Sequence, residues 1–184
     1  MKRPPGHLER EVERWSRGAS RRPRPHPVGP GQESVWDYPR PPRVEPVGTA
    51  VRVEVGGQRV ADTRACLRVL ETASPPTYYI PVRDVHMEWL IRGVGASWCE
   101  WKGEAAYWDL VGGSRPIAGV AWSYPDPFEE YAALRDHLAF FAQRADACFV
   151  GESRVTPQPG RFYGGWVTPS LAGPFKGEPG SQGW

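Results

Sequence analysis

Residues 50–62 read AVRVEVGGQRVAD, and this stretch decides the fold class. Apolar and polar residues alternate up to Val55, which is the pattern of a strand with one buried face. Gly56-Gly57 is a two-residue turn of the kind that tight hairpins prefer, and residues 58–62 supply the returning strand. The sequence therefore predicts an antiparallel β-hairpin at the start of the domain.

Short apolar or alternating runs continue this pattern towards the C-terminus. Further elements are expected at residues 65–71, 77–80, 84–91, 97–101, 105–111 and 117–122. Lys102-Gly103 and Gly112-Gly113 are expected to be turns, and Ser74-Pro75-Pro76 is expected to break the chain between two strands. One short helix is expected from Asp126, a capping residue that precedes Pro127. Seven or eight strands and one helix predict a mostly β, small antiparallel two-sheet domain with irregular arms.

Proline and glycine, 21 of each among 184 residues, gather at the two ends of the chain. The excess of basic residues is confined to the N-terminal end, where residues 1–30 carry a net charge of +5, whereas the remaining residues carry −3. Composition with little apolar content favours a disordered, solvated arm over a nucleic-acid site, so nucleic-acid binding is not expected. The predicted division is a basic, flexible arm at 1–33, a proline/aromatic docking segment at 34–48, a β domain at 49–150 and an irregular C-terminal tail at 151–184.

The cysteines and the hydropathy pattern exclude several classes of protein. Cys66, Cys99 and Cys148 are widely spaced and form no CxxC pair, so neither a disulfide framework nor a zinc site is expected. No apolar run is long enough for a bilayer, and the N-terminus has no apolar signal segment. We therefore expect a cytoplasmic protein with no metal, no cofactor and no membrane partner.

Four motifs carry a resemblance to a known family. They are residues 36–42 (WDYPRPP), 70–72 with Tyr78-Tyr79, 99–105 (CEWKGEA) with Tyr107-Trp108, and 121–127 (AWSYPDP). In this order they resemble a bacterial and fungal family known as a domain of unknown function, over about residues 34–184. The resemblance implies an Mss4-like or β-tent fold, in which two sheets are pinched together. Some proteins of that architecture bind zinc through CxxC pairs, which this chain lacks.

The same family also carries a nucleotidyltransferase label. Such enzymes need paired carboxylates that hold metal ions and the triphosphate. The core contains no Asp-x-Asp or Glu-x-Asp pair, so the residues do not support that activity.

Aromatic residues are dense between residues 78 and 131, where eleven occur. They predict either a plain aromatic core or an aromatic-lined pocket for a small planar or cationic ligand. The predicted ligand-binding residues are Glu71, Tyr78, Tyr79, Trp98, Trp101, Lys102, Trp108, Trp122 and Tyr124.

Three of the candidate residues have a competing interpretation. Lys102, at a hairpin turn among tryptophans, would bind an anion or stack on a ring; alternatively it is a solvated turn residue. Glu71 would supply a base and hydrogen bonds, or would pair at the surface with Arg68 or Arg83. Cys99 would be a nucleophile partnered by His86, although a buried structural thiol is the preferred interpretation.

Three functions follow from these residues. The first is binding of a small ligand in a pocket around Glu71, Lys102 and Trp122. The second is an enzyme that acts on a small metabolite or a nucleotide-related compound in the same pocket. The third is an interaction module whose proline-rich arms bind a partner or the second subunit of a homodimer.

Overall fold

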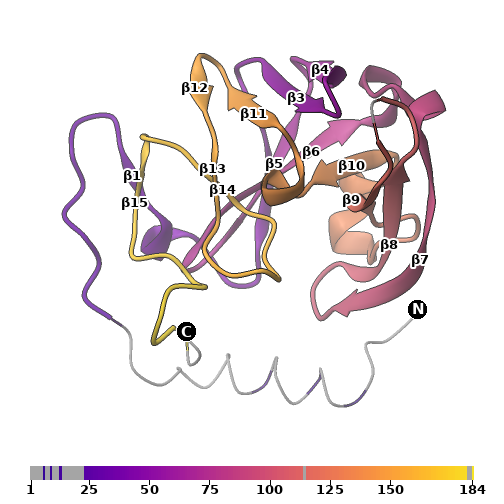
Figure 1. Cartoon of the computed structure of the whole chain (residues 1–184). Helices are drawn as coiled ribbons and strands as arrows, with labels where there is room; N and C mark the ends of the chain where they lie inside the picture. The colour runs from indigo at the N-terminus through magenta and orange to yellow at the C-terminus, as the bar shows by residue number, and fades with distance from the viewer. Residues whose placement is uncertain (1–5, 7–8, 10–12, 14–22, 114, 182–183) are drawn as a thin grey trace.

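The computed structural model describes residues 6, 9, 13, 23–113, 115–181 and 184 (Figure 1). Within it the predicted mostly β architecture is confirmed, with several antiparallel sheets and only short 3₁₀ helices after residue 22. None of the described helices is long and apolar enough to cross a bilayer.

The largest sheet has seven strands, and each strand is antiparallel to its neighbours. Their spatial order is β2 (Arg43–Pro46), β5 (Leu67–Glu71), β6 (Ser74–Pro81), β10 (His137–Phe140), β9 (Ile117–Ser123), β8 (Gly103–Leu110) and β7 (Leu90–Cys99). The second sheet has the order β12 (Ser153–Arg154), β11 (Ala147–Val150), β3 (Val51–Val55) and β4 (Gln58–Thr63).

Two small sheets and five 3₁₀ helices complete the described chain. β1 (Glu33–Ser34) pairs in parallel with β15 (Leu171–Ala172), and β13 (Thr156–Pro157) pairs antiparallel with β14 (Trp166–Val167). The helices are η1 (Val35–Asp37), η2 (Val82–Asp84), η3 (Met87–Trp89), η4 (Glu129–Leu134) and η5 (Ala142–Arg144).

The hairpin predicted at residues 50–62 is present as β3 and β4. Gly56 and Gly57 have φ angles of +61° and +77°, which a tight two-residue turn requires and which glycine adopts without strain. The alternating valines of β3, from Val51 to Val55, are fully buried, as the period-2 pattern predicts.

Two local predictions are wrong. The segment after Asp126 forms the 3₁₀ helix η4 with a non-helical Tyr131, because the Phe128 amide bonds the Lys102 carbonyl and no side chain caps the helix. Residues 74–76 do not break the chain but begin β6. The register between β5 and β6 shifts between Val69 and Glu71, so these prolines lie at an irregularity where a missing donor is tolerated.

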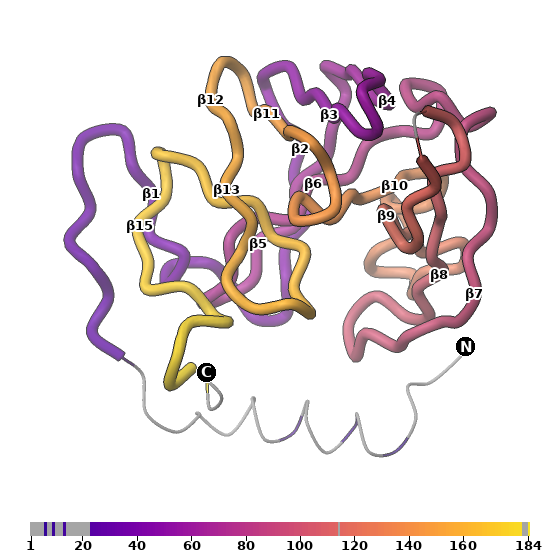
Figure 2. The backbone as a smooth tube through the Cα atoms, viewed as in Figure 1, coloured from indigo at the N-terminus to yellow at the C-terminus, as the bar shows by residue number. Residues whose placement is uncertain are grey.

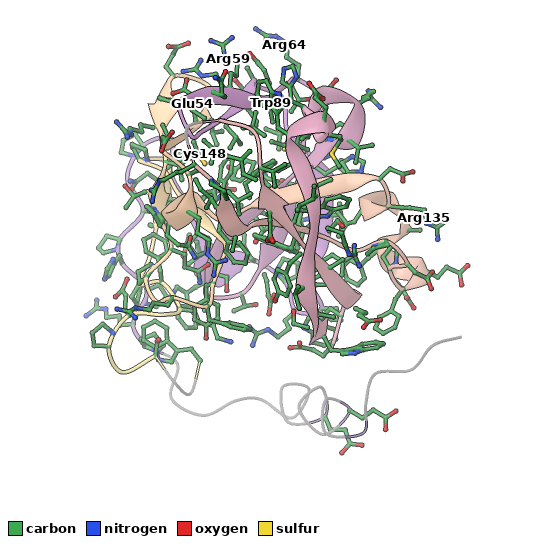
Figure 3. The ribbon with its side chains drawn as sticks, turned by 45° about the vertical axis from the view of Figure 1, so that its right-hand side comes forward. Glu54, Arg59, Arg64, Trp89, Arg135 and Cys148 are labelled. Carbon is green, nitrogen blue, oxygen red and sulfur yellow. The ribbon has the colours of Figure 1, made fainter. Side chains whose placement is uncertain are left out.

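The two faces of the seven-stranded sheet carry different clusters of buried side chains. One face packs on the buried valines of β3, with Ile80, Leu138 and Phe140 among the buried side chains of this core. The opposite face carries a second cluster that includes Tyr79, Trp122 and Ala139. Figure 3 shows Cys148 inside the molecule, whereas Arg59, Arg64 and Arg135 extend outward.

The C-terminal residues pack firmly although they form little regular structure. Trp166 is fully buried, stacks on Tyr78 at 5.0 Å and donates its indole N–H to the Phe140 carbonyl at 2.9 Å. The Trp36 indole likewise donates to the Pro174 carbonyl at 2.9 Å. Figure 2 shows the C-terminal strand β15 running beside β1. The division of the chain into arms and domain stays a prediction, and most of residues 1–22 lie outside the described residues.

Candidate functional site

A row of four residues crosses the seven-stranded sheet and forms the base of the site. Tyr79 of β6 is opposite Ala139 of β10, Ala139 is opposite Trp122 of β9, and Trp122 is opposite Tyr107 of β8. Side chains in one cross-strand row lie on the same face of a sheet. Four neighbouring strands, which Figure 1 shows in one sheet, therefore present three aromatic residues on the same face.

The small Ala139 leaves space for the rings on either side of it to meet. The Tyr79 and Trp122 rings lie edge to face with centroids 6.3 Å apart, and Tyr124 is also 6.3 Å from Tyr79. Phe141 packs against Trp122 at 4.3 Å. Tyr79, Trp122, Tyr124 and Phe141 thus form an aromatic wall, and each is at least nine-tenths buried.

The aromatic wall borders a cleft of about 980 Å³. Six of the nine predicted ligand-binding residues line it, and they are Glu71, Tyr79, Trp98, Lys102, Trp122 and Tyr124. Glu71 and Lys102 therefore face one common cavity, although they are 31 positions apart in the chain.

The structure places the other three predicted residues outside the cleft lining. Tyr78 and Trp108 are next to Tyr79 and Tyr107, and strand alternation turns them to the opposite face. There Tyr78 stacks on Trp166, and the Trp108 indole donates to the Ser123 hydroxyl at 3.0 Å. Trp101 lies in the turn before β8 and packs at the edge of the aromatic cluster.

Lys102 is buried, so the interpretation of this residue as a solvated turn lysine is wrong. Only 8% of it is exposed, and its Nζ lies 5.9 Å from the centre of the Tyr124 ring. Among the residues that the structure describes, no oxygen accepts a hydrogen bond from this ammonium group and no carboxylate forms an ion pair with it. A buried cation without an acceptor at the wall of a cleft is unusual, because burial of a charge is normally compensated by a partner.

The protonation of Lys102 and of its neighbours is set by burial and by their mutual charges. Burial alone lowers the pKa of Lys102, but Cys99, Tyr124, Tyr79 and Glu71 raise that pKa by more, so the net pKa lies well above 10.5. Burial raises the pKa of Tyr79 to about 12 and that of Tyr124 well above 10. At neutral pH the lysine is therefore a cation and the two tyrosines are neutral.

Glu71 is held by a different arginine from those predicted. Its carboxylate accepts from Arg40 Nη2 at 3.0 Å, and Arg40 also donates to the Thr72 carbonyl at 3.2 Å. Arg68 instead contacts Glu33 and Glu45. The Glu71 charge is thus already paired with Arg40, so Glu71 is an ordered residue of the cleft lining rather than a free base.

The sequence reasoning missed the part of the cleft that the C-terminal tail contributes. Arg161, Phe162, Tyr163, Lys176 and Trp184 line it on this side. The tail lies close to the aromatic wall, since a Cβ atom added at Gly164 would be 2.1 Å from Cη2 of Trp122. The only sequence signal for this contribution was the aromatic content of residues 161–184.

Cys99 also lines the cleft, and it is partly exposed rather than a buried structural thiol. It does not have His86 as a partner there. His86 stacks on Trp89 at 4.4 Å and its Nδ1 lies 2.8 Å from Glu88, and neither histidine nor glutamate is part of the lining. A Cys–His nucleophile is therefore not assembled at this site.

The described residues contain no group of three or more His, Cys, Asp or Glu side chains that could hold a metal ion. The cleft is instead built from rings, hydroxyl groups, one thiol and one buried ammonium. A family model named NTP_transf_9, described as a domain of unknown function (DUF427), matches residues 43–151. No curated protein matches the chain.

Proposed function

The chain belongs to the DUF427 family, whose model matches more than half of it, and we propose that it binds a small planar organic ligand in the cleft beside the aromatic wall. The observation that carries this proposal is the wall itself, which Tyr79, Trp122, Tyr124 and Phe141 form at the edge of a cavity of about 980 Å³. Small-molecule sites are typically concave, about 300–1,000 Å³ in volume and lined by aromatic side chains with a few polar groups.

Ligand binding is favoured over an interaction module by the packing of the arms. Trp36 and Tyr38, the aromatic residues of the segment at 34–48, are each only 6% exposed within the chain itself. Aromatic residues that are already buried are not available to anchor a partner protein. A homodimer formed through other surfaces stays a prediction.

A thermal-shift screen of neutral and charged aromatic metabolites tests the proposal, since a ligand that binds only the folded state raises Tm. We expect several compounds to stabilise the wild-type protein and to lose this effect in Trp122→Leu. Trp108→Leu is the matched control, because it removes an indole from the opposite face of the same sheet. Ligands that stabilise both variants equally would place their site elsewhere and refute the proposal.

An enzyme that uses the same cleft is the second candidate, and the Cys99 thiol favours it. This thiol is partly exposed and lines the cleft, so a bound ligand could reach it, as a nucleophile requires. Incubation of each stabilising compound with wild-type protein and with Cys99→Ser, followed by mass spectrometry, separates the two candidates. New products that require Cys99 indicate an enzyme, whereas unchanged ligand indicates a binding protein.

Two further properties are proposals of the same kind. A reducing compartment such as the cytoplasm fits three cysteines that are all free. An Mss4-like or β-tent fold fits two larger antiparallel sheets that share one core. A solved structure of this chain tests the second property by direct comparison of strand order.

A further inference from the structure

We propose that Lys102 is the anion-binding residue of the cleft, and that its ligand is a small molecule with a planar apolar body and a single carboxylate. This inference rests on the proposed ligand-binding function and goes further, because it names the chemical class of the ligand.

Lys102 is the one buried cation among the described residues that line the cleft. The other basic residues of the lining are Arg144, Arg161 and Lys176, and none of them is buried. Arg144 is also engaged, since Nη1 donates to the carbonyls of Ala118 and Gly119 at 3.0 and 2.7 Å. The cleft therefore has one buried ammonium group from which no group of the described residues accepts a hydrogen bond.

Among the described residues, the carboxylate side chains that line the cleft are Glu71, Glu100 and Asp109, and none of them forms an ion pair with Lys102, although the Glu71 charge favours the protonated lysine. The Glu71 carboxylate is already bound by Arg40 at 3.0 Å, and Asp109 accepts the Gly119 amide at 2.6 Å. Tyr79 and Tyr124 keep their protons, so they are neutral hydrogen-bond donors towards an incoming anion. A ligand oxygen with negative charge would supply the acceptor that Lys102 lacks, and charge-assisted hydrogen bonds of this kind are strong.

The single charge of Lys102 favours a carboxylate over a phosphate monoester. A carboxylate carries one negative charge, which one ammonium group neutralises. A phosphate monoester carries about −1.5 to −2 at pH 7, so that part of its charge would stay uncompensated in a buried site. The adjoining aromatic wall can pack against a planar apolar group, so we expect the carboxylate ligand to carry such a group.

The lysine content of the chain permits a direct test by NMR. The protein has only three lysines, Lys2, Lys102 and Lys176. Full-length protein labelled with ¹³C and ¹⁵N lysine therefore gives three side-chain Cε–Nζ signals, which Lys102→Met and Lys176→Met assign. The probes are sodium benzoate and sodium naphthalene-2-carboxylate, with the corresponding neutral amides and phenyl phosphate as comparisons.

We expect the carboxylates to shift the Lys102 signal in a saturable manner while the Lys2 signal stays in place. The amides and phenyl phosphate should bind at least about tenfold more weakly than the carboxylates. Lys102→Met should lower carboxylate affinity by about tenfold or more. Arg59→Met, which removes an exposed positive charge outside the cleft lining, should leave that affinity nearly unchanged.

The outcomes separate this inference from the function on which it rests. If amides bind as well as carboxylates, and equally to Lys102→Met, the cleft binds ligands but the anion site is refuted. If phenyl phosphate binds best, the site is anionic but the carboxylate class is wrong. If neither the anionic nor the neutral probes shift the signals of Lys102 and Lys176, the two lysines of the cleft lining, the proposed function fails together with the inference.

Discussion

Lys102→Met should make the ligand-free protein more stable at pH 7. The two tyrosines that raise the Lys102 pKa do so as anions at alkaline pH and are neutral at pH 7, so they do not offset the cost of burying the ammonium group there. Methionine has nearly the same length and removes only the charge and its donors. Burial of an ion costs several kcal/mol, and replacement of buried ionic groups by apolar ones is often stabilising by about 1–4 kcal/mol. Against this stands the loss of the contact between Lys102 Nζ and the Tyr124 ring at 5.9 Å, worth about 0.5–2 kcal/mol.

The balance predicts a gain of about 1–2 kcal/mol in the free energy of unfolding at pH 7. For a chain of this size that corresponds to a rise in Tm of about 2–8 °C. The assay is urea unfolding in a buffer free of organic acids, with thermal unfolding as a second measurement. Lys176→Met is the matched control, because this lysine is only partly buried and lies 5.8 Å from the Tyr163 ring.

The control should lose up to about 1 kcal/mol, since it gives up a ring contact and relieves little burial. A clear loss of stability in Lys102→Met would show that the ammonium group has a stabilising partner in the free protein. In that case the lysine is a structural residue, and the reasoning that leads to the anion site is refuted.

Three further predictions concern the packing that shapes the cleft. Trp166→Phe should lose about 1–3 kcal/mol of stability, because the buried Phe140 carbonyl loses its donor at 2.9 Å. Its control, Phe162→Ala, changes a residue that is 77% exposed and should be nearly neutral, so equal urea midpoints for the two variants would contradict this packing. Gly164→Ala should lose about 1–3 kcal/mol of stability, because the added Cβ would displace the tail from Trp122. In the control Gly48→Ala the added Cβ has no atom within 4 Å, so the stability should change little, and comparable urea midpoints for the two variants would place the tail elsewhere. The urea midpoint should fall as pH rises above about 9, because burial raises the pKa of Cys66 and of Cys148 from 9.0 to about 12. Below about pH 9 both thiols are protonated in the folded and the unfolded state, whereas between about pH 9 and 12 only the unfolded state loses the protons, which lowers the free energy of unfolding. The double variant Cys66→Ala/Cys148→Ala should delay this fall to about pH 10, where Tyr79 begins to contribute, and a wild-type midpoint that is constant to pH 11 would exclude the effect.

The fold class could be predicted because β-structure leaves a local signature in this chain. The alternation in β3 and the glycine pair that follows it are enough to specify a hairpin without knowledge of the rest. The sequence gives no comparable signal that the helix expected at Asp126 would not form. Its failure depends on a bond from the Phe128 amide to the Lys102 carbonyl, and a contact across 26 positions leaves no trace in local sequence.

The site was partly predictable for a related reason. Aromatic density identified the correct strands, but it could not select the correct face of each strand. Tyr79 and Tyr78 are adjacent and chemically identical, and only the register with Ala139 decides which of them reaches the cleft. Lys102 was recognisable as an isolated lysine, yet its burial depends on tertiary packing against Tyr124.

The two halves of the cleft also differ in their relation to the family. The aromatic wall and Lys102 lie within residues 43–151, which the family model matches, whereas Arg161, Tyr163 and Lys176 lie in the tail beyond it. Recognition of the charge and of the planar body would thus reside in the shared domain, and the tail would decide which molecules can enter. Since Gly164 of the tail lies so close to Trp122, a larger residue at this position would change the size of the site while Lys102 stays in the domain. A chain with the same domain and a different tail would then keep the preference for a carboxylate and bind molecules of another size.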